Sequence, residues 1–284
     1  MPKVAIITDS TAYLPDAVVK ELHITVTPQI LIWGDETFQD GVDILPDDFY
    51  RKLETAKVMP TTSQVAIVTM KDTYESLLEA GYDVMGIFVS AKLSGTMHSA
   101  IQAREMLPKA ANRIVVVDSN TTAMAMGFHV MVAARAAQAG ASLVECEHVA
   151  EEARKHTGVY FVVETLEFLR RGGRIGGAQA LLGSALNIKP LLELRDGRIE
   201  SIEKVRTKGK AISRMIDLVV EKAAGRNPVR LATLHANAEA EARAALQVAA
   251  ARLDPVEQIL ASVSPVIGTH AGPGTVGLAY MAGM

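Results

Sequence analysis

The first half of the chain alternates short apolar runs with longer segments in which apolar residues recur at helical spacing. Val4–Thr8 is a continuous, β-branched run, which is typical of a strand buried on both faces. Further strands are predicted at Val84–Val89 and Ile114–Val117, with an extended segment at Ile24–Trp33. Helices are predicted at 47–56, 73–80, 96–106, 124–139 and 143–156. This alternation predicts an α/β fold with a parallel sheet that helices cover on both faces.

The pattern changes after residue 156. A strand at Gly158–Val163 and a helical turn at Leu166–Leu169 precede the glycine-rich stretch RRGGRIGG. Two strand-like runs then flank Arg195–Arg198, whose Asp-Gly pair is a strong hairpin signal. The remaining predicted elements are a helix, a strand, a helix and a strand: Lys208–Ala224, Arg230–Leu234, Ala238–Leu253 and Val256–Ser262. We expect an α/β domain over residues 1–155 and an α+β domain over residues 156–284, with the final segment returning to the cleft.

Small clusters of hydroxyl and carboxyl side chains follow three of the predicted strands. They are Asp9–Thr11, Ser90–Ser94 and Asp118–Asn120. Ligands of open parallel sheets bind beyond the carboxyl ends of the strands, where these clusters are expected to lie. The same residue types also serve as helix N-caps. The sequence leaves both interpretations open.

The stretch VIGTHAGPGTVG at Val266–Gly277 contains four glycines and one histidine. Glycine allows the backbone to adopt left-handed conformations and to approach another group closely. We therefore expect a flexible loop that closes over a ligand and leads into a last strand at Gly277–Tyr280.

Composition and charge narrow the class of protein. The 284 residues are 49% hydrophobic and 21% charged, which is a globular composition, and the net charge of −3 argues against binding to nucleic acid. Cys146 is the only cysteine, so an internal disulfide is excluded and a reducing compartment fits. No signal-peptide core and no apolar run of about 18–20 residues occur. We expect a soluble cytoplasmic protein without a membrane segment.

Common catalytic and nucleotide-binding motifs are missing. The sequence has no G-x-x-x-x-G-K-[ST], no G-x-G-x-x-G after the first strand, no H-E-x-x-H and no G-x-S-x-G. His148 and His156 lie eight residues apart on a predicted helix among acidic residues, and we interpret them as part of a solvated face. No metal site is expected.

Seven short motifs, taken in order, carry a resemblance to a known family. They are ITDST at 7–11, QDGVDI at 39–44, PTTSQ at 60–64, KLSGTMHSA at 92–100, LRRGGRI at 169–175, NIKPLL at 187–192 and VIGTHAGPGTVG at 266–277. This set resembles the DegV family, which includes the fatty-acid-binding subunits (FakB type) of bacterial fatty acid kinase. The resemblance covers essentially the whole chain.

The resemblance implies a Rossmann-like amino-terminal domain and an α+β lipid-binding carboxyl-terminal domain, with a long-chain fatty acid in a tunnel between them. A separate kinase subunit would carry ATP and phosphorylate the carboxylate to an acyl phosphate for phospholipid synthesis. The chain itself would be a non-catalytic, cytoplasmic binding subunit. Its partners would be the fatty acid and the kinase subunit, it would need no cofactor, and a monomer is the simplest expectation.

Matching motif to motif, the resemblance places the carboxylate contacts on Thr62, Ser94, Gly95 and His270. Thr62 is preferred to Thr61 by alignment to the TSQ motif. Arg174 matches a basic position associated with phosphate or the kinase, and Arg170 is assigned to the same role.

These residue types suit the problem that a bound fatty acid poses. Burying the tail gains about 0.8 kcal/mol per CH₂, but the carboxylate then needs fixed hydrogen-bond donors at the edge of the apolar region. Hydroxyl groups, glycine N–H groups and an imidazole N–H supply such donors. Ser94 also precedes a predicted helix, whose amino-terminal end would add positive potential.

The tunnel wall and the partner surface are less specific predictions. Candidates for the wall, each of which could equally be ordinary core, are Ile30, Ile32, Ile87, Val89, Met97, Met124, Met126, Leu166, Leu186 and Ile188. Residues 164–214 hold eleven Lys or Arg and six Asp or Glu, a local charge of +5 that favours an acidic partner or an acyl phosphate. A solvated hairpin with basic side chains is the alternative.

Two other functions compete. Ser94 as nucleophile and His270 as base would make an acyl hydrolase or thioesterase, although no nucleophile-elbow pattern surrounds Ser94 and no acidic third member is evident. A phosphate- or nucleotide-binding role through Arg170–Gly177 is weakened by the missing phosphate loop.

Overall fold

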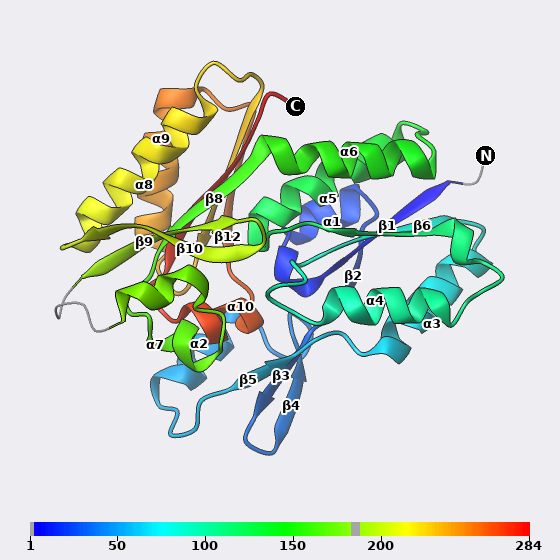
Figure 1. Ribbon diagram of the computed structural model, residues 1–284, viewed down its shortest axis with the longest axis horizontal. Helices are drawn as coiled ribbons and strands as arrows, with labels where there is room; N and C mark the ends of the chain where they lie inside the picture. The colour runs from blue at the N-terminus through cyan, green and yellow to red at the C-terminus, as the bar shows by residue number, and fades with distance from the viewer. Residues whose placement is uncertain (1–2, 183–187) are drawn as a thin grey trace.

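The computed structural model describes residues 3–182 and 188–284. Two large sheets and one small sheet are joined by helices (Figure 1). Leu186, one of the residues predicted to line the tunnel, and the first residue of the NIKPLL motif lie outside the described residues.

The first sheet has four parallel strands in the order β2-β1-β6-β7. Their bounds are β1 Val4–Asp9, β2 Thr25–Thr27, β6 Asp83–Phe88 and β7 Ile114–Asp118. Neighbouring residues of β1 point into different cores, because Ile6 packs in one hydrophobic cluster and Ile7 in another. The parallel sheet covered on both faces is therefore confirmed. Its strand order reverses between β1 and β6, and the ligand sites of such sheets lie at this point.

Helices form layers on both sides of this sheet (Figure 1). On one side α3 and α4 pack against each other and against β6, and on the other side α5 and α6 do so. The bounds are α1 Asp16–Glu21, α3 Ile67–Glu79, α4 Thr96–Glu105, α5 Ala123–Gln138 and α6 Leu143–His156, with 3-10 turns at Ser10–Ala12 and Ala111–Arg113.

The second sheet has six strands in the order β10-β9-β8-β13-β11-β12. Their bounds are β8 Thr157–Val162, β9 Lys189–Arg195, β10 Arg198–Val205, β11 Val229–His235, β12 Glu257–Ser262 and β13 Val276–Ala282. The predicted hairpin is confirmed, since β9 and β10 pair antiparallel and both Asp196 and Gly197 have positive φ, as a type I′ turn requires. The last strand, β13, lies in the middle of the sheet.

One face of the second sheet packs against α8 Lys208–Ala223 and α9 Glu239–Leu253. The other face packs against α5 and α6, so that these two helices form a layer between the two large sheets. A single hydrophobic cluster thus contains residues of both sheets, including Ile6 and Phe161. The proposed division between residues 155 and 156 separates the sheets along the chain and stays a prediction.

A small sheet that the hydrophobic pattern did not predict lies beside the cleft. It has the order β4-β3-β5, with β3 Ile30–Trp33, β4 Glu36–Gln39 and β5 Thr61–Ser63. Helix α2, Pro46–Glu54, connects β4 to β5 in sequence. Ile24–Trp33, expected as one extended segment, is divided between β2 and β3. Strand β5 carries Thr62 and pairs it with Leu31.

The stretch at Val266–Gly277 differs from its expectation. It begins within a seven-residue helix, α10 Pro265–Ala271, that Ser264 caps by accepting a hydrogen bond from the amide of Ile267 at 3.3 Å. Only the turn after the helix is glycine-rich, with Gly272 and Gly274 in the left-handed region. His270 is therefore held on a helix rather than on a flexible loop. The remaining elements are α7 Glu167–Arg171 and a 3-10 turn at Gly176–Leu181.

One buried histidine conflicts with its surroundings. His129 on α5 is 1% exposed, and within the described part of the chain neither of its ring nitrogens has a hydrogen-bond partner. Burial, together with the charge of Arg154, lowers the pKa of His129 to about 3. The imidazole is therefore neutral in the folded protein at any pH above this value.

Replacing His129 by leucine should reduce the acid sensitivity of the fold. Between pH 6.5 and about 3, His129 is protonated in the unfolded chain but neutral in the folded protein. The free energy of unfolding therefore falls by about 1.4 kcal/mol per pH unit as the pH is lowered. Urea unfolding at several pH values should show a shallower decline for His129→Leu than for the wild type. His148→Leu, on the exposed side of α6, is the control. Identical declines for His129→Leu and the wild type would contradict the prediction.

Candidate functional site

A cavity lies beyond the carboxyl ends of β1 and β6 and reaches the inner face of the second sheet. It encloses about 900 Å³ that protein atoms do not fill, part of it open to solvent. Most of the wall is apolar, and its larger side chains are Val89, Phe161, Leu169, Leu194, Ile199, Leu234, Val263 and Ile267.

Among the described residues predicted to form the tunnel wall, only Val89 lines the cavity. Ile87, Met97 and Met124 are instead buried in the hydrophobic clusters. They are ordinary core residues, which was the alternative interpretation. Five apolar wall residues come from β8, β9, β10 and β11, because the inner face of the second sheet turns toward the cavity, and the others come from α5, α7, α10 and loops. The sequence pattern does not reveal which side chains of these strands point to that face.

The polar end of the cavity brings together the three stretches that carried the predicted head-group contacts. Thr62, Ser94, Gly95 and His270 all line the cavity. The Oγ1 of Thr62 lies 2.8 Å from the Nε2 of His270, and this hydrogen bond joins residues 208 positions apart in sequence. Thr61, the alternative to Thr62, lines a neighbouring cavity but not this one.

His270 is neutral and its orientation is fixed. Burial lowers the pKa of His270 to about 4, and the charge of Arg174 lowers it further in the same direction. Its Nδ1 packs against Gly172, where an added Cβ would lie only 2.0 Å away, and within the described residues Nδ1 has no hydrogen-bond partner. A buried unpaired N–H is costly, so we assign the proton to Nε2. Nε2–H then donates to Thr62, whose own O–H is free to donate to a ligand.

Ser94 and Gly95 form the start of α4 at the same end of the cavity. The Oγ of Ser94 accepts a hydrogen bond from the amide of Thr96 at 3.3 Å and lies 3.0 Å from the hydroxyl of Thr96. Ser94 therefore accepts from the first amide of α4 and lines the cavity at once, although the N-cap position itself is Gly95. A Cβ at Gly95 would lie 3.1 Å from the side chain of Gln64, which also lines the cavity. The amino-terminal end of α4 adds positive potential there.

Arg174 also reaches the polar end, whereas Arg170 does not. The Arg174 side chain donates from Nε to the carbonyl of Leu93 at 2.9 Å and from Nη1 to the carbonyl of Gly172 at 2.5 Å. It therefore ties the turn after α7 to the loop that carries Ser94. Arg170 is paired with Glu167 at 2.9 Å and lines neither cavity among the described residues.

A second cavity shares a wall with the first. It encloses about 700 Å³ and has Thr62, Arg174 and His270 in common with the first cavity. The rest of its lining comes from α2, from the start of β5 and the residues before it, from α7 and the residue after it, and from α10: Leu53, Met59, Pro60, Thr61, Phe168, Arg171, Gly172 and Thr269. Thr62, His270 and the guanidinium of Arg174 therefore lie between the two cavities.

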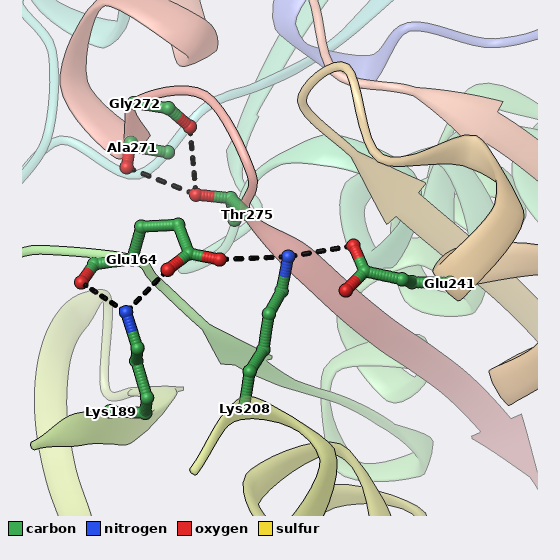
Figure 2. Close-up of polar contacts among 7 residues, drawn as sticks. All are labelled: Glu164, Lys189, Lys208, Glu241, Ala271, Gly272 and Thr275. Atoms are coloured by element: carbon green, nitrogen blue, oxygen red, sulfur yellow. Dashed lines mark hydrogen bonds and ion pairs between the residues drawn. The ribbon is translucent and has the colours of Figure 1, made fainter.

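The positively charged segment is largely paired within the chain. Lys208 bridges Glu164 at 2.9 Å and Glu241 at 2.6 Å, and Lys189 also pairs with Glu164 (Figure 2). Glu164 in turn packs against Gly274, where a Cβ would lie 2.5 Å from its Cγ. These ion pairs support the turn after α10 and reduce the charge that the segment presents to a partner.

The geometry does not assemble a hydrolase triad from Ser94 and His270. His270 uses Nε2 for Thr62, and no hydrogen bond between Ser94 and His270 occurs among the residues described. No carboxylate in this part of the structure accepts from Nδ1. Residues 3–182 and 188–284 also contain no cluster of three His, Cys, Asp or Glu side chains that could hold a metal, and no helix among them is long and apolar enough to cross a bilayer.

Gln29 and Gln64 are cavity residues that the sequence did not reveal. Gln29 is 2% exposed and donates from Nε2 to Asp9 at 3.2 Å. The other carboxyl oxygen of Asp9 accepts from the amide of Val89 at 2.8 Å, so that Asp9 joins the ends of β1 and β6. The cluster at Asp9–Thr11 was a visible signal for this edge, but Gln29 lies in a short connection without any motif.

The chain was compared with known families, curated sequences and solved structures. A family model described as "Uncharacterised protein, DegV family" matches residues 3–283. A DegV domain-containing protein of Streptomyces coelicolor is 40% identical over 97% of both chains, and protein DegV of Bacillus subtilis is 35% identical over 98% of both.

Two solved structures have the same fold. One, described as showing fatty acid binding of a DegV family protein from Thermus thermophilus, superposes with a TM-score of 0.92 at 34% identity over 99% of both chains. The other is DegV, a fatty acid binding protein from Bacillus subtilis, with a TM-score of 0.90 at 35% identity over 99% of this chain and 100% of that one. The sequence match over nearly the whole length and the shared fold establish that this chain belongs to the DegV family.

Proposed function

We propose that this protein binds a long-chain fatty acid, with the tail in the apolar part of the first cavity and the carboxylate at the hydroxyl of Thr62, which His270 orients. The observation that carries the proposal is the hydrogen bond between these two side chains at the polar end of an otherwise apolar cavity. Relatives of similar fold are described as fatty acid binding proteins, which supports the same ligand class.

The arrangement meets both requirements of such a ligand. The tail leaves water at a gain of about 0.8 kcal/mol per CH₂ and meets aliphatic and aromatic side chains of β8 to β11. The head group meets the hydroxyl of Thr62, the hydroxyl of Ser94 and the backbone of Gly95 just before α4. These donors are neutral, and the guanidinium of Arg174 is already engaged with two carbonyls. The carboxylate is therefore held without a bidentate ion pair that would lower its nucleophilicity.

We further propose that the bound carboxylate is presented to a separate ATP-dependent fatty acid kinase subunit. In that reaction a carboxylate oxygen forms a bond to the γ-phosphorus of ATP, the bond from that phosphorus to the β–γ bridging oxygen breaks, and ADP leaves. The second cavity supports this role, because it reaches the same Thr62, Arg174 and His270 from another side. Arg174 would then face the transferred phosphoryl group. In this proposal the chain is a cytoplasmic, monomeric, non-catalytic subunit.

Protein purified from a bacterial host should carry one intact fatty acid per chain. Native mass spectrometry should show the mass of the complex, and the delipidated protein should take up one equivalent of palmitate. The delipidated chain must first give a cooperative unfolding transition, so that it is known to be folded. Failure of folded, delipidated protein to take up palmitate would contradict the proposed function.

Thr62→Val should weaken binding of palmitate about tenfold, because it removes one hydrogen-bond donor to a charged group while keeping the side-chain shape. Binding of methyl palmitate, which has no carboxylate, should change little. Thr37→Val, an exposed threonine on β4 of the same small sheet, is the matched control. An equal loss for palmitate and its methyl ester would show that Thr62 acts by packing and not on the carboxylate.

Arg174→Ala should lower acyl-phosphate formation about tenfold or more when a bacterial fatty acid kinase subunit is supplied, because it removes the cation that faces the transferred group. Retention of palmitate should fall no more than about twofold to threefold. Arg174→Lys should restore part of the rate, and Arg243→Ala on the exposed side of α9 is the control. If Arg174→Ala instead empties the cavity and leaves the rate per bound lipid unchanged, the assignment is wrong.

A further inference from the structure

A buried carboxylate lies outside both cavities but contacts the helix that carries His270. Asp40, at the residue after β4, is 1% exposed and lines neither cavity among the described residues. Its Oδ2 accepts a hydrogen bond from the hydroxyl of Ser10 at 2.6 Å, and its Oδ1 accepts from the amide of Val266 at 3.4 Å. The side chain of Ser264 is a further hydrogen-bond partner.

Through these contacts Asp40 connects three parts of the fold. Ser10 directly follows β1, and Ser264 and Val266 are the N-cap and the first turn of α10. Val266 precedes His270 by four residues, so the two lie one turn apart on the same side of the helix. A shift of the start of α10 is therefore passed directly to His270.

Contacts with α2 leave α10 little freedom to compensate. Gly268, in the middle of α10, lies against α2, and a Cβ at this position would be 2.5 Å from the Oη of Tyr50 and 2.9 Å from the ring of Phe49. The helix is thus located at its start by Asp40, in its middle by α2 and at its end by the hydrogen bond to Thr62. Of these three contacts, only the one at Asp40 involves a charge.

The charge of Asp40 is unfavourable for folding. Burial raises the pKa of Asp40 to about 6, against the lowering effect of its hydrogen bonds, and the charge of Asp9 raises it further. The other titratable groups that face it are Tyr13 and Tyr50, and no ion pair to Asp40 is found among the residues described. Between pH 3.8 and about 6 the folded state binds more protons than the unfolded state, so stability falls as pH rises through this range. Global stability therefore does not explain why a carboxylate is needed here.

The chemistry of its partners gives a different reason. Ser10 and Val266 both donate to Asp40, and Ser264 also bonds to it. An ionised carboxylate accepts on both oxygens, whereas a protonated acid or an amide presents a donor on one of them. A neutral form keeps these contacts only if a serine hydroxyl turns from donor to acceptor, so the hydrogen bonds that join β1 to the start of α10 must rearrange.

We propose that Asp40 is a positioning residue that acts through α10, and that its charge holds His270 at hydrogen-bond distance from Thr62 and so strengthens binding of the fatty acid carboxylate. This inference rests on the proposed function for its ligand, but the effect on His270 does not require a ligand.

The test compares Asp40→Asn with Asp43→Asn, a matched change in the same loop, where the exposed Asp43 accepts from the amide of Gln39 at 2.7 Å. At pH 7.5, Asp40→Asn should bind palmitate about tenfold more weakly than the wild type, and Asp43→Asn should stay within about twofold. The free energy of unfolding of Asp40→Asn should be unchanged or higher. In the delipidated protein, the ¹⁵N signals of His270, assigned with His270→Gln, should move away from the Nε2–H tautomer in Asp40→Asn only.

The pH dependence provides an independent measurement. Palmitate affinity of the wild type should fall as pH is lowered through about 6, where Asp40 takes up a proton, and Asp40→Asn should lack this step. Changes that come from titration of the ligand occur in both proteins and cancel in the comparison.

The outcomes separate the two proposals. If folded wild type does not bind palmitate, the proposed function fails, and the His270 signals alone then decide the role of Asp40. If the wild type binds palmitate and Asp40→Asn binds equally well with unchanged His270 signals, the role of Asp40 is overturned and the proposed function stands. Should Asp40→Asn not fold, Ser10→Ala replaces it: weaker binding with shifted His270 signals supports the inference, and unchanged values overturn it.

Discussion

The candidate site depends on one contact, the hydrogen bond between Thr62 and His270. It joins residues 208 positions apart, and each comes from an element that is stable only in its tertiary context. Strand β5 has three residues and needs β3 as its partner, and α10 has seven residues and needs α2 and Asp40. Isolated elements of this length are not stable in water. The contact therefore exists only when both large sheets and the small sheet are in place.

Glycine residues allow α10 to pack closely enough for the hydrogen bond between Thr62 and His270 to form. Gly172 lies against the imidazole of His270, and Gly268 lies against Tyr50, so that any side chain at either position would push α10 away. The turn after α10 uses Gly272 and Gly274 in the left-handed region, and Glu164 packs against Gly274. This turn leads into β13, the central strand of the second sheet. The glycine-rich composition near the end of the chain thus serves close packing on both sides of a helix.

The sequence predicts the parts of this structure that follow local rules. The parallel strands show continuous β-branched runs, and the β9–β10 hairpin shows its Asp-Gly turn. Strands β4 and β5 are too short to show a periodic pattern. Helix α10 does have a start signal, Ser264 as N-cap and Pro265 in the first turn, but this signal lies just before the glycine-rich stretch. Ser94 and His270 lie in stretches that the sequence itself marks as candidates, but Thr62 and the proposed role of all three as head-group contacts came only from the family resemblance. The cavity wall was not predictable, because it depends on which face of β8 to β11 turns inward, and that is a property of the tertiary arrangement.

Burial shifts the pKa values of the titratable groups near the polar end of the cavity, and this affects the electrostatic potential there. Burial raises the pKa of Asp40 to about 6 and lowers that of His270 to about 4, so each group is shifted toward its neutral form. Burial also raises the pKa of Asp9. The remaining positive influences at the polar end are Arg174 and the amino-terminal end of α4, and the first of these already interacts with two carbonyl dipoles. No Asp or Glu side chain of the described residues lines the cavity itself. In the proposed function, these positive influences would therefore favour an anionic head group over an uncharged one.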